Sequence, residues 1–178
     1  MKINFIDLQG QYKKYKNEID NEIHEVLDTS SYIMGKKIFD LEENLSNYIG
    51  VKHSIACSSG TDALILALMS MDIQPGDEVI TTPFTFIATA EAICFLKAVP
   101  IFVDIEENTY NIDVTQIENK ITAKTKAIIP VSLFGQIADM DKINEIAKRN
   151  DLIVIEDAAQ SFGAEYKGEK SCSLSDIA

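Results

Sequence analysis

Short runs rich in valine and isoleucine alternate along this chain with segments of helical periodicity. Strands are expected at residues 53–57, 78–81, 99–103, 126–131 and 152–155. Consecutive strands that lie parallel need long crossover connections, which are usually helices. The alternation therefore predicts an α/β fold, with a mostly parallel sheet and helices on both of its faces.

The segments between these strands carry helix signals. Residues 61–71 are apolar almost throughout, residues 113–116 resemble a capping box that opens a short helix, and residues 141–150 carry an apolar face. Before the first strand, apolar residues recur at helical spacing in two further segments. We expect residues 1–50 to form amino-terminal helices that pack on a large domain, and residues 51–178 to form the first part of that domain.

Composition narrows the kind of ligand. The chain of 178 residues has a formal net charge of -12, which opposes nucleic acid or an anionic membrane as partner. No apolar stretch approaches the roughly 18 residues of a spanning helix, and the sequence after Met1 has no signal-peptide core, so a cytoplasmic protein is predicted. With two histidines and three widely spaced cysteines, we expect reduced thiols and no metal site.

The run 152–155 ends abruptly in Glu156 and Asp157, with Gln160 close behind. Open α/β sheets bind ligands just beyond the carboxyl ends of their buried strands, so Asp157 is expected beside a ligand. A half-buried carboxylate is unfavourable unless a cation or a set of donors compensates it. The residues alone leave two interpretations, a partner for a cationic ligand atom and a structural cap on the following segment.

Other loops are expected at the same edge of the sheet. Residues 57–62 combine hydroxyls, the flexible Gly60 and a helix amino terminus, which suits an anion but also an ordinary N-cap. Phe84 and Phe86 follow the strand 78–81, and one ring is available to stack on a planar ligand unless both belong to the core. No dinucleotide or Walker glycine motif is present.

Together these loops select a ligand that has a phosphate, a flat ring and a cationic ring atom. Pyridoxal phosphate fits this description. Its phosphate is expected at Gly60 and Thr61, its ring face against Phe86, its protonated ring nitrogen at Asp157 and its phenolic oxygen at Gln160. A hydrogen bond to a charged group contributes about 1.5–3 kcal/mol, and Asp157 would keep the ring protonated.

Five runs in this sequence resemble the DegT/DnrJ/EryC1/StrS family of sugar aminotransferases, in the family's order and spacing. They are residues 59–64, 75–80, 83–86, 130–135 and 156–161. The resemblance implies the large domain of the type I pyridoxal-phosphate-dependent transferase fold, which is aspartate aminotransferase-like, and a homodimer. It also implies amino transfer from glutamate to a nucleotide-linked keto sugar, in amino-sugar or surface-glycan biosynthesis. Residues 166–168 and 173–176 resemble, more weakly, the branch that acts on 3-keto sugars.

In residue terms, the resemblance assigns Gly60, Thr61, Phe86, Asp157 and Gln160 to cofactor binding, and makes Asp157 catalytic as well. The family's Schiff-base lysine follows shortly after the position of Ala178, so it is not in this chain. We therefore expect an amino-terminal part of a longer enzyme, inactive alone, with a strand beginning within residues 171–178.

The cationic residues that the chain does contain are expected elsewhere. Lys167 and Lys170 lie in a polar turn, and Arg149, the only arginine, ends an outer helix.

Two alternative functions stay open: a sugar dehydratase or isomerase of the same fold in which the lysine is replaced, and a non-catalytic α/β binding domain such as a phosphate receiver. Receivers need an acidic pair after their first strand, whereas residues 52–57 lead to hydroxyls.

Overall fold

The structure is a computed structural model that describes residues 6–178 and divides into two compact units, Met1–Leu45 and Ser46–Ala178. Residues 1–5, at the amino terminus interpreted above as lacking a signal-peptide core, lie outside the described residues. Within residues 6–178, no helix combines the length and the apolar character needed to cross a membrane. The boundary between the units falls inside a helix, a few residues before the boundary expected from the sequence.

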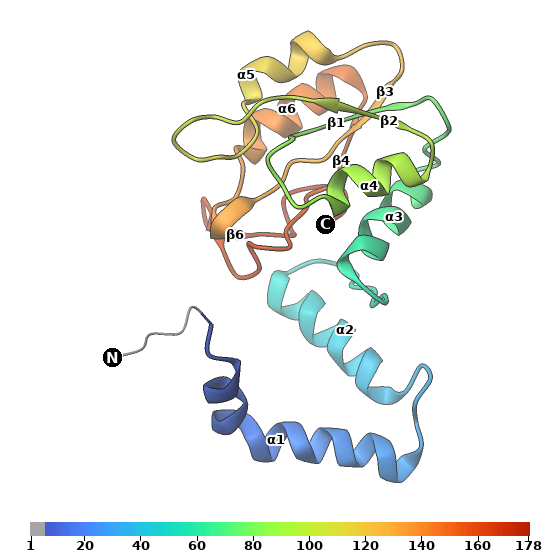
Figure 1. Cartoon of the computed structure of the whole chain (residues 1–178), viewed down its shortest axis with the longest axis vertical. Helices are drawn as coiled ribbons and strands as arrows, with labels where there is room; N and C mark the ends of the chain where they lie inside the picture. The colour runs from blue at the N-terminus through green and yellow to red at the C-terminus, as the bar shows by residue number, and fades with distance from the viewer. Residues whose placement is uncertain (1–5) are drawn as a thin grey trace. The chain divides into compact units, whose positions relative to one another are not determined.

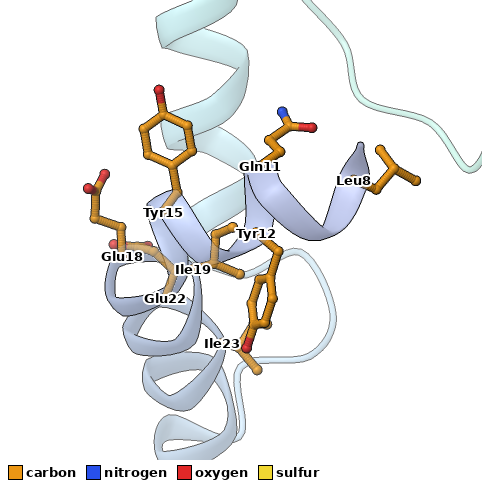
Figure 2. Close-up of a pocket in the computed structure, with 8 residues that line it drawn as sticks. All are labelled: Leu8, Gln11, Tyr12, Tyr15, Glu18, Ile19, Glu22 and Ile23. Carbon is orange, nitrogen blue, oxygen red and sulfur yellow. The ribbon is translucent and has the colours of Figure 1, made fainter. Parts of the chain in front are cut away.

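Two helices account for most of the first unit, as their periodicity predicts: α1 (Leu8–Thr29) and α2 (Lys36–Ile49). The Asp7 carboxylate caps α1 by accepting a hydrogen bond from Gly10 N at 3.0 Å, and the helix is kinked at Tyr15. Lys37 of α2 forms ion pairs with Glu22 and Glu25 of α1. Figure 2 shows the shallow hollow along α1, where Tyr12 and Ile23 lie on the same side of the helix.

The second unit is built on a parallel sheet, as the β–α alternation predicts. Its strands are β1 (Glu78–Thr81), β2 (Val99–Phe102), β3 (Thr125–Ile128) and β4 (Ile153–Val154), in the spatial order β2-β1-β3-β4. All three strand pairs are parallel. Beyond β4, Ile155 forms a single parallel bridge with Ile177, so the end of the chain runs along this edge of the sheet.

Helices cover both faces of the sheet, which confirms the predicted layers (Figure 1). On one face, Val79 and Ala127 pack with buried residues of α3 (Gly60–Ser70) and α4 (Ala88–Phe95). On the other, Ile80 and Ile128 pack with α5 (Val114–Ile117), which continues into the 3-10 helix η1 (Glu118–Lys120), and with α6 (Met140–Asn150). Successive strand residues point to opposite faces, so β1, β3 and β4 each supply side chains to both cores. Each buried valine or isoleucine contributes roughly 1.5–3 kcal/mol.

One predicted strand is wrong. Residues 53–57 have no regular secondary structure, and Ile55 is 83% exposed. A β-strand exists only where a neighbouring strand accepts its backbone hydrogen bonds and covers its side chains. The sheet formed by residues 78–154 provides no such place for this segment, although its composition suits a strand.

The polar turn near the end of the chain is a two-stranded antiparallel hairpin of β5 (Glu165–Tyr166) and β6 (Glu169–Lys170). Its two turn residues, Lys167 and Gly168, have φ values of 54° and 92°. Positive φ at both residues of a two-residue turn gives the turn a twist that matches the twist of the two hairpin strands. Lys167 forms an ion pair with Asp141, and the Lys170 ammonium lies 3.8 Å from the ring centroid of Tyr48. Both lysines are thus engaged by other residues of this chain.

Candidate active site

Asp157 lies where β4 has just ended, at the carboxyl edge of the sheet. Its N–H donates to Pro130 O at 2.9 Å, and its C=O accepts from Ser132 N at 3.1 Å. Val131 and Asp157 form an isolated parallel bridge that continues the pairing of β3 with β4. Because both strands run in the same direction, the polar residues that follow them meet at one edge. This confirms the expected position of Asp157 in the fold.

The Asp157 carboxylate is half-buried and held at both oxygens. Thr89 Oγ1 donates to Oδ2 at 2.7 Å, and Ala159 N donates to Oδ1 at 3.3 Å. None of the ion pairs within residues 6–178 includes Asp157. Among the described residues, its charge is therefore compensated by neutral donors alone. A carboxylate has about four acceptor positions, so it keeps capacity for a further donor, above all a cationic one.

Gln160 is oriented by the loop that follows β3. Its Oε1 accepts a hydrogen bond from Phe134 N at 2.9 Å. That loop includes the 3-10 turn η2 (Leu133–Gly135), in which Phe134 and Gly135 both have positive φ. With the amide oxygen engaged, the amide NH₂ is the group of Gln160 that remains to donate to a ligand.

Phe86 lies in the turn between β1 and α4, and 74% of its surface is exposed. Its C=O accepts from Thr89 N at 3.3 Å, so the turn is tied to the residue that binds Asp157. Phe84 has a different role, because its ring packs with those of Tyr110 and Phe134 at centroid distances of 5.6 and 6.5 Å. Phe86 is therefore the ring that is free to lie against a planar ligand.

The helix amino terminus predicted at Gly60 is present, at the start of α3. Ser59 is its N-cap: Ser59 Oγ accepts from Asp62 N at 3.1 Å, and Ser59 O accepts from Ala63 N at 2.9 Å. The first helical N–H groups have no partner inside the helix. Since those of residues 62 and 63 are satisfied, the donors left in this turn, among the described residues, are Gly60 N and Thr61 N.

The two serine hydroxyls of this loop already form hydrogen bonds. Ser58 Oγ and Ser59 Oγ both donate to Asp62 Oδ2, and these bonds lower the pKa of the Asp62 carboxyl. A bound anion would therefore depend on backbone N–H groups and the helix dipole rather than on the two serines. Within residues 6–178, the structure shows no hydrogen bond between Gly60 or Thr61 and the other predicted site residues.

The N-cap carries a testable stability effect. Ser59→Ala removes the oxygen that satisfies Asp62 N and is expected to lower the free energy of unfolding by about 1 kcal/mol. Ser70→Ala, at the other end of α3, is the matched control and is expected to change it by less than about 0.5 kcal/mol. Urea denaturation of both variants measures the difference. Equal values would mean that Ser59 does not cap the helix.

Sequence reasoning did not foresee the surroundings of Glu156. The residue is 1% exposed, and its carboxyl group accepts hydrogen bonds from Ser132 Oγ at 2.7 Å, Ser171 Oγ at 3.0 Å and Cys172 N at 2.8 Å. Neighbouring residues at a strand end point to opposite sides. Glu156 therefore faces inward and joins three segments, while Asp157 faces the site. The available signal was Ser132, which directly follows the strand expected at residues 126–131, because neighbouring parallel strands place the residues after their ends side by side.

These observations define an α/β fold with polar residues gathered at the carboxyl edge of its parallel sheet, and comparison with known proteins identifies the family. Residues 13–178 match the DegT/DnrJ/EryC1/StrS aminotransferase family, and the chain belongs to that family. It is 52% identical over 176 residues to a UDP-2-acetamido-2-deoxy-3-oxo-D-glucuronate aminotransferase of Pseudomonas aeruginosa, covering 99% of this chain and 49% of that protein. The chain spans about half the length of the curated relatives it matches.

Solved structures agree with this assignment. A family aminotransferase from Brucella abortus superimposes with a TM-score of 0.89 at 43% identity, over 91% of this chain and 45% of that one. NtdA from Bacillus subtilis, solved with the cofactor PMP bound, gives a TM-score of 0.84 at 41% identity, over 89% and 37% of the two chains. These structures confirm the predicted fold class, the type I fold of pyridoxal-phosphate-dependent transferases.

The residues present here fit such a cofactor. Asp157 has a carboxylate with spare acceptor capacity and no cationic partner within residues 6–178, as a protonated ring nitrogen requires. Gln160 has an oriented amide donor, and the turn at Gly60 offers two backbone N–H groups. Arg149 is not part of this arrangement, because it forms ion pairs with Glu118 and Glu145.

Proposed function

We propose that this chain is part of a pyridoxal-phosphate-dependent aminotransferase that moves an amino group from glutamate to a nucleotide-linked keto sugar. The observation that carries the proposal is that Asp157 and Gln160 both follow β4 at the carboxyl edge of the sheet and are bonded to the segment that follows β3, in a member of a sugar aminotransferase family. The name of the Pseudomonas relative favours a 3-keto sugar, in agreement with the weaker resemblance seen in the sequence.

When bound, pyridoxal phosphate supplies an electron-accepting ring that makes a carbon-bound proton of the amine substrate removable. Different residues of the chain would bind different parts of the cofactor. Asp157 would keep the proton on the ring nitrogen, Gln160 would donate to the phenolic oxygen, and Phe86 would cover one face of the ring. Gly60 and Thr61 would donate their N–H groups to the phosphate, where the dipole of α3 adds about 0.3–1 kcal/mol.

Other groups must come from outside these residues. A carboxylate or a diphosphate is normally bound by a placed guanidinium, and the single arginine of this chain is paired on the outer surface of α6. The base that moves the substrate proton, a lysine in the family resemblance, is likewise expected beyond Ala178. The homodimer belongs to the same proposal and rests on the resemblance. The cytoplasmic location and the packing of residues 1–50 on the large domain are proposed from the sequence pattern alone.

The test uses the protein expressed from its complete reading frame. We expect it to bind pyridoxal phosphate and, after borohydride reduction, to carry the cofactor covalently on one lysine, identified by peptide mass spectrometry. Binding without covalent capture would favour the dehydratase or isomerase alternative. A protein that does not bind the cofactor would be a non-catalytic domain.

The substrate is tested separately. With glutamate as donor, a set of UDP-, dTDP- and GDP-linked keto sugars is offered, and formation of 2-oxoglutarate and of the amino sugar is measured. We expect turnover with a 3-keto sugar. Turnover confined to 4-keto sugars would contradict the finer assignment and leave the aminotransferase class in place.

A further inference from the structure

Thr89 contacts both Asp157, which the proposed function places at the cofactor ring nitrogen, and Phe86, which it places against the ring face. Its hydroxyl donates to Asp157 Oδ2 at 2.7 Å, and its backbone N–H donates to Phe86 O at 3.3 Å. Thr89 lies in the first turn of α4, and its side chain is fully buried. One residue of α4 thus fixes the carboxylate directly and the turn that carries the aromatic ring through its backbone.

A second hydroxyl stands behind the first. Thr85 Oγ1 lies 3.1 Å from Thr89 Oγ1. A hydroxyl has one proton to donate, and an ionised carboxylate only accepts. Because the Thr89 proton is directed to Asp157, Thr85 must be the donor to Thr89. The result is a chain of hydrogen bonds, Thr85 to Thr89 to Asp157, whose members polarise one another in the same direction.

We propose that Thr89, supported by Thr85, is a positioning residue that holds the Asp157 carboxylate in the orientation that binds the cofactor ring nitrogen. The inference rests on the proposed function. With Oδ2 held by Thr89 and Oδ1 by Ala159 N, the carboxylate cannot rotate without breaking a bond at one end. The orientation therefore exists before the cofactor arrives, which removes an ordering cost from binding.

Two substitutions separate this role from simple packing. Thr89→Val keeps the shape of the side chain and removes the donor, whereas Thr89→Ser keeps the donor and removes a methyl group. A packing role would make valine harmless and serine damaging. A positioning role gives the opposite order, because serine restores the bond to Asp157.

The experiment measures binding of pyridoxamine phosphate, which forms no covalent bond with a lysine, to the apoprotein of complete length by isothermal titration calorimetry. We expect Thr89→Val to bind roughly 10- to 100-fold more weakly than the parent, as the loss of one hydrogen bond to a charged group predicts. Thr89→Ser is expected to stay within about threefold of the parent, since its hydroxyl retains that bond.

The outcomes are distinguishable. If the parent protein binds no pyridoxamine phosphate, both the proposed function and this inference fail. If the parent binds and Thr89→Val binds equally well, or Thr89→Ser is as weak as Thr89→Val, only the inference fails. Should circular dichroism show that Thr89→Val is unfolded, Thr85→Val decides: we expect severalfold weaker binding, and affinity equal to that of the parent would overturn the hydrogen-bonded chain.

Discussion

Asp157→Asn is expected to reduce turnover of the complete enzyme by on the order of 100-fold, equivalent to roughly 2.7 kcal/mol of activation free energy. Asparagine has nearly the size of aspartate and keeps an oxygen that can accept from Thr89. It has no charge, so it cannot hold a proton on the cofactor ring nitrogen. The ring would then be a much poorer electron acceptor.

The same variant is expected to fold. The backbone bonds of residue 157 to Pro130 and Ser132 do not involve its side chain. Steady-state turnover with glutamate, together with urea denaturation, measures both effects. Asp151→Asn is the matched control, because Asp151 is exposed at the end of α6 in a left-handed conformation that asparagine tolerates. Near-normal turnover of Asp157→Asn would remove Asp157 from the mechanism.

The parallel sheet could be predicted from the sequence because its signal is local. Val79 and Ile80, or Ala127 and Ile128, are apolar neighbours that face opposite cores, and only a strand covered on both sides needs such runs. The segment 53–57 carries the same local signal and forms no strand. Strand pairing depends on two segments. The five residues of one segment do not indicate whether a second strand will lie beside it.

The candidate site likewise has residues that could be predicted from the sequence and residues that could not. Asp157 and Gln160 were predicted because a strand end has a fixed place in an open sheet. The residues that orient them were missed, because Thr89 is 68 positions from Asp157 in sequence and only packing brings them together. Phe134 was also missed, since its positive φ is typical of glycine, so no sequence rule gives its contact with Gln160.

Glu156→Ala is expected to have the largest effect on stability, lowering the free energy of unfolding by roughly 3–5 kcal/mol, because each buried donor left without an acceptor costs about 1–3 kcal/mol. The substitution leaves the hydroxyl of Ser132 and the N–H of Cys172 without their acceptor, whereas the Ser171 hydroxyl still has Ser161 Oγ at 2.7 Å. These donors belong to two segments far apart in the sequence that both bind this carboxyl group. Glu156→Gln keeps the volume but turns one acceptor into a donor, so an intermediate loss is expected.

Urea denaturation of both variants measures the effect. Glu145→Ala is the control, because it removes an exposed carboxylate whose ion pair with Arg149 contributes at most about 1 kcal/mol. A Glu156→Ala variant as stable as this control would show that water replaces the lost acceptor. Asp157→Asn, in contrast, strands no buried donor and is expected to stay within about 1 kcal/mol of the parent in stability. Adjacent carboxyl groups on opposite sides of one strand end would then be separable by experiment, with Glu156 acting on stability and Asp157 on turnover.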